Sequence, residues 1–75
     1  MTPYRDWDND SGVNAYDVGP THIDVEFKSG AVYRYTEQSV GSMNLSQMVS
    51  LAKAGEGLNS FIQRIVKKRY SAQLR

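Results

Sequence analysis

The stretch from His22 to Thr36 constrains the fold more than any other, because two alternating segments flank a short turn. Residues 22–28 alternate polar and apolar side chains, which is the period-2 pattern of a half-buried strand. Residues 31–36 place aromatic side chains at alternate positions, and Ser29-Gly30 between the two segments is typical of a two-residue hairpin turn. The sequence therefore predicts a β-hairpin with one face toward a core.

Residues 13–18 predict a strand before this hairpin, with Val13 and Ala15 on one of its two sides. The sequence Gly19-Pro20 ends it, because proline cannot donate to a strand ladder and holds the residue before it in an extended conformation. A turn at this point leads the chain back antiparallel. We therefore expect a three-stranded antiparallel β-meander.

After Thr36 the apolar period changes from 2 to 3.6, which indicates helices. A first helix is expected over residues 42–54, capped by Ser42 or Asn44 and ended by Gly55. Its core-facing positions are Leu45, Met48, Val49 and Ala52, and both of its methionines are expected to fill gaps in the core.

A second helix is expected over residues 58–70, with Asn59 or Ser60 as its N-cap. We expect Phe61 in the core; the full apolar stripe is Leu58, Phe61, Ile62 and Ile65. The predicted class is α+β, with a three-stranded antiparallel β-meander followed by two helices packed on one face of it, in the order β-β-β-α-α.

Residues 1–11 are acidic and show no periodicity, so we expect a flexible acidic tail before a single domain over residues 12–75. In the tail, Asp6, Asp8 and Asp10 have the spacing of the first ligands of a calcium loop. Ser11 stands where that loop needs glycine, and no helix is expected on either side. We therefore expect no metal site.

Tyr33 and Tyr35 lie two residues apart on the return strand of the hairpin. Such a pair is either a stacking platform for nucleic-acid bases or a structural part of the core beneath the helices. The face that carries more apolar bulk is the one that helices cover. We expect the two tyrosines to join Ile23, Val25 and Phe27 on that face.

Charge is distributed unevenly along the chain. Residues 1–30 contain six acidic and two basic side chains, whereas residues 31–75 contain seven basic and two acidic ones. On the second helix, Arg64, Lys67 and Lys68 lie opposite the apolar stripe. A basic face of this kind fits an anionic partner, and it is also a common solubilising surface.

The residues offer little for catalysis. His22 is the only histidine, there is no cysteine, and no nucleophile-base pair, carboxylate pair or phosphate-binding loop is present. No apolar run reaches the ~20 residues that a membrane helix needs. We expect a cytoplasmic protein that is not an enzyme, uses no cofactor and does not enter a membrane.

Four short motifs carry a family resemblance: Tyr16-Asp17, the run Phe27-Lys28-Ser29-Gly30, Tyr33-Arg34-Tyr35, and Gly55 followed by Leu58, Asn59 and Ile62. In these motifs, over about residues 13–70, the chain resembles the KTSC domain family, small bacterial modules found alone or at the C-terminus of some lysyl-tRNA synthetases. Two positions depart from the family pattern: Val40-Gly41 replaces Val-Pro, and Val66 replaces a tyrosine, with Tyr70 one turn later.

The resemblance implies a small accessory domain for which RNA binding has been suggested. We expect phosphates to be contacted by a basic set, and Arg34 to contact bases together with Tyr33 and Tyr35; the basic set is Arg64, Lys67, Lys68 and Arg69. The alternative is a protein-interaction module of a bacterial or phage accessory protein, which would use the open sheet face or Trp7.

Overall fold

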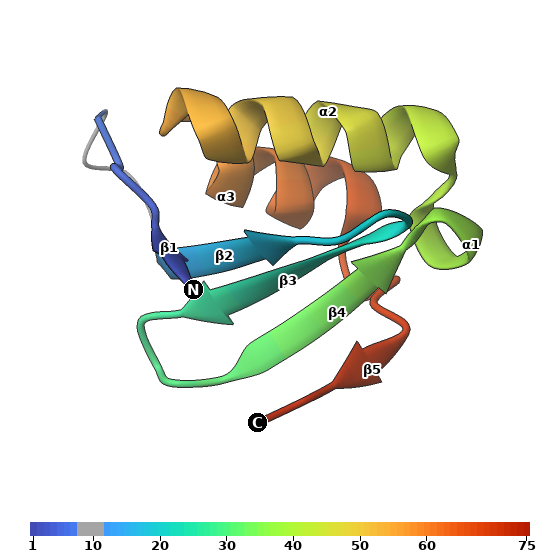
Figure 1. Ribbon diagram of the computed structural model, residues 1–75, viewed down its shortest axis with the longest axis horizontal. Helices are drawn as coiled ribbons and strands as arrows, with labels where there is room; N and C mark the ends of the chain where they lie inside the picture. Colours follow the sequence, from blue (N-terminus) through green and yellow to red (C-terminus); the bar gives the residue numbers. More distant parts are fainter. Residues whose placement is uncertain (8–11) are drawn as a thin grey trace.

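An antiparallel sheet carries the helices α2 and α3 on one of its faces (Figure 1). The computed structural model describes residues 1–7 and 12–75. In this part of the chain the sheet has five strands in the order β1-β2-β3-β4-β5. They are β1 (Thr2–Pro3), β2 (Val13–Val18), β3 (His22–Phe27), β4 (Val32–Thr36) and β5 (Ala72–Gln73).

The predicted α+β class is confirmed, but the sheet is wider than the expected three-stranded meander. Both ends of the chain add a short strand, since β1 pairs with β2 and β5 pairs with β4. Strands of two residues have no alternation that a sequence pattern could reveal. The three central strands lie close to their predicted bounds.

The expected tail is wrong for residues 1–7, because this segment folds onto the domain. Tyr4 is buried, with only 6% of its surface exposed, and its backbone N–H donates to the Asn14 carbonyl oxygen at 3.0 Å. Its hydroxyl accepts a hydrogen bond from the backbone N–H of Leu58 at 3.1 Å. The calcium pattern at Asp8 and Asp10 lies outside the described residues.

The central hairpin has a three-residue loop and not the predicted two-residue turn. The Phe27 N–H donates to the Ala31 oxygen at 2.8 Å, so residues 28–30 form the loop, and Gly30 has the positive φ of 96° that ends it. This register pairs Ile23 with Tyr35 and Val25 with Tyr33. Both tyrosines therefore lie on the core face, as predicted.

A β-bulge at Asn14 corrects the predicted faces of β2. Val13 pairs with Phe27, whereas Ala15 pairs with Glu26, so Asn14 is an extra residue in its strand. The bulge turns Val13 into the core with Tyr16 and puts Ala15 on the opposite face. A regular alternation of side chains along the strand predicts Val13 and Ala15 on the same face of the sheet.

The helix α2 (Ser42–Ala54) has the predicted bounds and ends at Gly55, whose φ is 81°. Its N-cap is Gly41, with no side-chain cap, so neither Ser42 nor Asn44 has the expected capping role. The Asn44 side chain donates instead to the Val40 carbonyl oxygen at 2.9 Å. Of the two methionines, Met48 is buried and Met43 is exposed.

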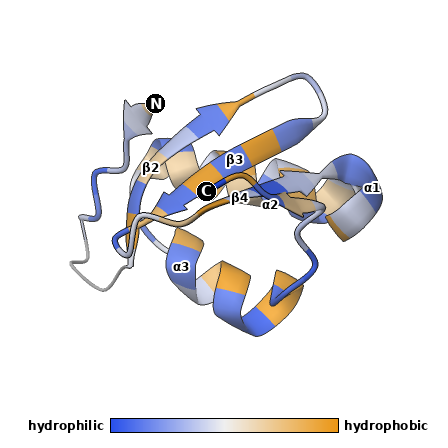
Figure 2. Cartoon of the chain, turned by 90° about the horizontal axis from the view of Figure 1, so that it is seen from below, coloured by the Kyte–Doolittle hydropathy of each residue, from blue (hydrophilic) through white to orange (hydrophobic). Residues whose placement is uncertain are grey.

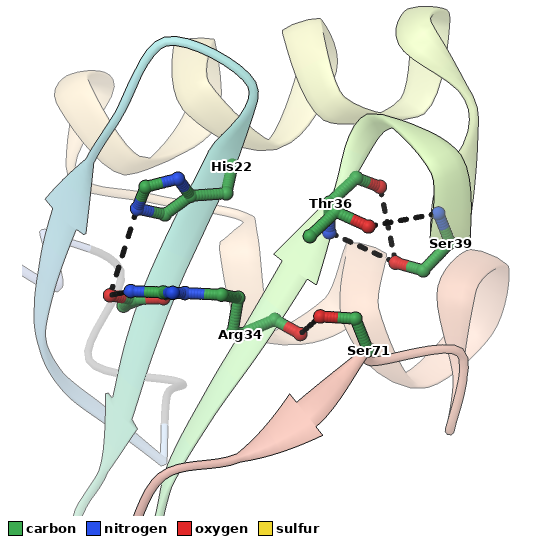
Figure 3. Close-up of polar contacts among 6 residues, drawn as sticks. His22, Arg34, Thr36, Ser39 and Ser71 are labelled. Atoms are coloured by element: carbon green, nitrogen blue, oxygen red, sulfur yellow. Dashed lines mark hydrogen bonds and ion pairs between the residues drawn. The ribbon is translucent and has the colours of Figure 1, made fainter.

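A short helix α1 (Glu37–Val40) precedes α2 and was not predicted. Thr36 and Ser39 form a capping box, in which each side chain binds the other's backbone N–H (Figure 3). The predicted first helix begins at residue 42, so residues 37–40 were expected to lie in a loop. One helical turn is too short for a 3.6-residue period to be visible.

The last helix is α3 (Leu58–Phe61), which continues as the π-helical segment η1 (Ile62–Val66). It ends at Val66 and not at residue 70, and the residues beyond it turn back toward the sheet (Figure 1). Its N-cap is Gly57, so the expected caps at Asn59 and Ser60 are wrong. The Tyr4 hydroxyl binds the first N–H of the helix in their place.

The π-helical turn changes which side chains reach the core. A π turn holds more residues than an α turn, so positions four apart align along η1. Leu58, Ile62 and Val66 are buried, whereas Phe61 is only half-buried and Ile65 is 47% exposed. The expected core position is therefore wrong for Ile65, while Phe61 packs against the core without being fully buried in it.

We predict that Ile62→Ala lowers the free energy of unfolding by about 2 to 5 kcal/mol, because it leaves a cavity among buried side chains. The matched change Ile65→Ala should cost less than about 1 kcal/mol, since that side chain is half in solvent. Urea unfolding followed by circular dichroism measures both values. Equal losses would mean that the helix turns a different face to the sheet.

Candidate functional site

A cavity of about 430 Å³ lies on the core face of the sheet, against η1 and the residues that follow it. It is lined by Phe27, Tyr33, Tyr35, Ile62, Gln63, Lys67, Lys68 and Tyr70. Four of the residues selected from the sequence meet here: the two tyrosines of β4, and Lys67 and Lys68. The cavity is thus lined by an aromatic cluster and by two lysine residues.

The aromatic wall is a cluster of four rings that contact one another. The ring centroids of Tyr33 and Tyr70 are 4.4 Å apart, with a tilt of 45° between the rings. Phe27 meets Tyr33 edge-on at 5.8 Å, and Tyr35 meets Tyr70 edge-on at 6.2 Å. Both tyrosines of β4 line the cavity, but Tyr35 is buried in the core, whereas Tyr33 is only half-buried.

Tyr70 was missed as a site residue. The sequence placed it at the end of the last helix, whereas it follows the turn after η1 and packs its ring against β4. The only sequence signal for Tyr70 was the resemblance to the KTSC family, because Tyr70 stands one turn after the position where that family has a tyrosine. The contact between Tyr33 and Tyr70 joins two residues that are far apart in the sequence.

The turn that carries the lysines has a strained backbone. Lys67 has φ 51° and ψ −120°, which is close to the first central position of a type II′ turn, where glycine is the usual residue. The Arg69 N–H closes this turn on the Val66 oxygen at 2.9 Å. A non-glycine residue held in such a conformation costs about 1 to 3 kcal/mol, and such residues cluster at functional sites.

Arg34 lies on the opposite face of the sheet from the cavity. Its guanidinium donates two hydrogen bonds to the Asp24 carboxylate, at 2.8 and 3.0 Å, and this bond and charge raise the pKa of Arg34 (Figure 3). The His22 Nε2 atom lies 3.9 Å from the same carboxylate. Hydropathy alternates along β3 (Figure 2). Because successive side chains of a strand point to opposite faces, His22 and Glu26 share the outer face with Asp24.

Arg64 and Arg69, the other two predicted basic residues, are exposed and do not line the cavity. The outer face of the sheet also holds Glu26, which accepts from the Asn14 side chain at 2.8 Å and from Arg75 at 3.2 Å. The structure therefore separates the predicted set: the two lysines join the tyrosines, and Arg34 belongs to an ion-paired surface.

Within the described ranges, no three His, Asp or Glu side chains come close enough together to share a metal ion. In the same ranges, none of the helices has the length and hydropathy of a membrane span. Comparisons with protein-family models, with curated proteins and with solved structures found no match to this chain. The resemblance to the KTSC family therefore stays a prediction.

We predict that Lys67→Gly raises the free energy of unfolding by about 1 kcal/mol, because glycine adopts the positive φ without strain. Lys68→Gly is the matched control, and it should be neutral or lower stability by up to about 1 kcal/mol through the entropy of the unfolded chain. Thermal and urea unfolding measure both. A loss of stability in Lys67→Gly would contradict the strained conformation.

A second prediction concerns Tyr35. Burial, together with the neighbouring Tyr33 and Tyr70, raises the pKa of the Tyr35 hydroxyl to about 12. In the unfolded chain the Tyr35 hydroxyl ionises near pH 10. The stability that comes from keeping this hydroxyl neutral in the folded protein is therefore complete below pH 10, and it is lost as the pH rises toward about 12. The melting temperature should fall over that interval, and Tyr35→Phe should make the fall shallower. An identical alkaline profile in this variant would show that Tyr35 is not buried as described.

Proposed function

We propose that this protein is a small non-catalytic accessory domain that binds single-stranded nucleic acid, with RNA as its ligand, through the cavity at Tyr33 and Tyr70. The observation that carries the proposal is the placement of Lys67 and Lys68 beside an aromatic wall. Single-strand binders combine these two features: cations that attract the phosphates and rings on which bases stack.

The charges around the cavity decide between ligand classes. An aromatic cluster can also serve as a cage for a quaternary ammonium ligand, but such a ligand would be repelled by the Lys67 and Lys68 ammonium groups. An anion that carries flat rings is attracted by the lysines and can stack on the aromatic rings.

We also propose that the protein belongs to the KTSC family and is cytoplasmic. The lack of cysteine is compatible with that location.

The test is a titration of the protein with labelled single-stranded RNA at several salt concentrations. If Lys67 and Lys68 together neutralise one or two phosphate charges, log K should fall with log salt with a slope of about −0.7 to −1.4. Reversal of both charges, Lys67→Glu with Lys68→Glu, should remove most of the affinity and most of the slope. Both side chains are exposed, so the fold should survive the change.

The matched control is Lys53→Glu with Arg64→Glu, which changes the net charge equally at exposed sites outside the cavity. Lys53 lies in the last turn of α2, and Arg64 lies in η1. This control should keep most of the affinity and the slope of the parent. Equal losses in the two double variants would show that only net charge matters, and no binding at low salt would refute the proposal.

Trp7 favours a second candidate, a protein-interaction module. The residue is 64% exposed, yet its backbone is held to the domain, because its N–H donates to the Gly55 oxygen at 2.7 Å. The Arg5 guanidinium lies 5.5 Å from the centre of the indole ring. Tryptophan and arginine are among the residue types that contribute most to binding energy at protein–protein interfaces. Under this candidate, Trp7→Ala abolishes partner binding, while under the main proposal it leaves RNA binding unchanged.

A further inference from the structure

We propose that the cavity takes one nucleotide unit, with its base against the Tyr33 and Tyr70 wall and its phosphate at Lys67 and Lys68. This inference rests on the proposed function and narrows it: the domain reads a single unstacked or terminal nucleotide and not a length of strand. The shared chemistry is a flat ring with a phosphate, and its source is either a free nucleotide or one residue of a strand.

The aromatic geometry limits the number of bases to one. Tyr33 and Tyr70 lie 4.4 Å apart and cover part of each other's faces, so no base fits between them. Phe27 meets Tyr33 at an interplanar angle of 70°, and Tyr35 meets Tyr70 at 89°, so neither pair forms a parallel slot into which a base could insert. The rings therefore pack on one another and are not spaced as separate platforms, in contrast to grooves in which successive rings take successive bases.

The size of the cavity agrees with this limit. Its volume of about 430 Å³ lies near the lower end of the range for small-molecule pockets, about 300 to 1,000 Å³. Single-strand grooves instead extend along about 4 to 16 nucleotides.

The position of the two lysines in one turn is compatible with a single phosphate group. Lys67 and Lys68 are neighbours in one tight turn, closed by the bond from the Arg69 N–H to the Val66 oxygen, and both line the same cavity. Cations that follow a strand would be spread along a groove. Lys67 keeps its strained conformation at the cavity rim, where glycine would fit the backbone better but would supply no charge.

The experiment is a length series on the full chain, with uridine monophosphate and 5′-phosphorylated oligouridines of two, four and eight nucleotides. In a groove, each further stacked base raises the affinity about five- to 150-fold. For a single-nucleotide site, the affinity should stop rising at an oligomer length of two nucleotides. Uridine monophosphate should then displace half of the bound octamer when its concentration is within about tenfold of the octamer concentration. Isothermal titration calorimetry should give one nucleotide site per protein chain.

A steady rise in affinity from one to eight nucleotides, without competition by the monophosphate, would overturn this inference and leave single-strand binding intact. Binding of the monophosphate without binding of any oligomer would support the site and refute the proposed function. Free nucleotide is then the source of the ligand. No binding of any member of the series would overturn both.

Lys67→Gly removes the charge of one lysine at the cavity. The variant should keep its fold, because glycine relieves the backbone strain at this position. Its affinity for uridine monophosphate should fall at least about tenfold, as expected for a lost bond to a charged group. Lys53→Ala removes a charge outside the cavity and should leave the affinity unchanged. Unaltered binding by Lys67→Gly would remove Lys67 from the site and contradict the inference.

Discussion

The register between β3 and β4 is the constraint on which the rest of the structure depends. Side chains alternate between the two faces of a sheet, so a slip of one residue would exchange the faces of the whole strand. The three-residue loop at 28–30 fixes Val25 opposite Tyr33 and Asp24 opposite Arg34. The first pair builds the core and the aromatic wall, and the second builds the ion-paired outer face.

The two ends of the chain then complete the domain through contacts that are distant in sequence. The Tyr4 hydroxyl binds the Leu58 N–H, so the N-terminal segment supplies the cap that α3 lacks. The C-terminal segment returns to the sheet, where the Ser71 N–H donates to the Arg34 oxygen at 2.7 Å and β5 pairs with β4. This return places Tyr70 on Tyr33, so the cavity depends on the last residues of the chain.

Strong local patterns were predicted correctly from the sequence, and features that arise from distant contacts were not. The hairpin faces and the bounds of α2 follow from clear periods of 2 and 3.6 and from Gly55. The bulge at Asn14 and the π turn in η1 each insert residues into a regular pattern, so counting positions failed there. The lysines and β4 tyrosines of the site were selected by residue type, while Tyr70 and the separation of Arg34 required the fold.

The central claim is that the cavity beside Tyr33 and Tyr70 binds a nucleotide, and the most direct measurement is a chemical-shift titration. The full, ¹⁵N-labelled chain is titrated with a short single-stranded RNA, and backbone amide shifts are followed residue by residue. The account predicts saturable shifts concentrated at Phe27, Tyr33 and residues 67–70, with little change at Asp24. Shifts confined to the outer face of the sheet, or no saturable shifts, would contradict it.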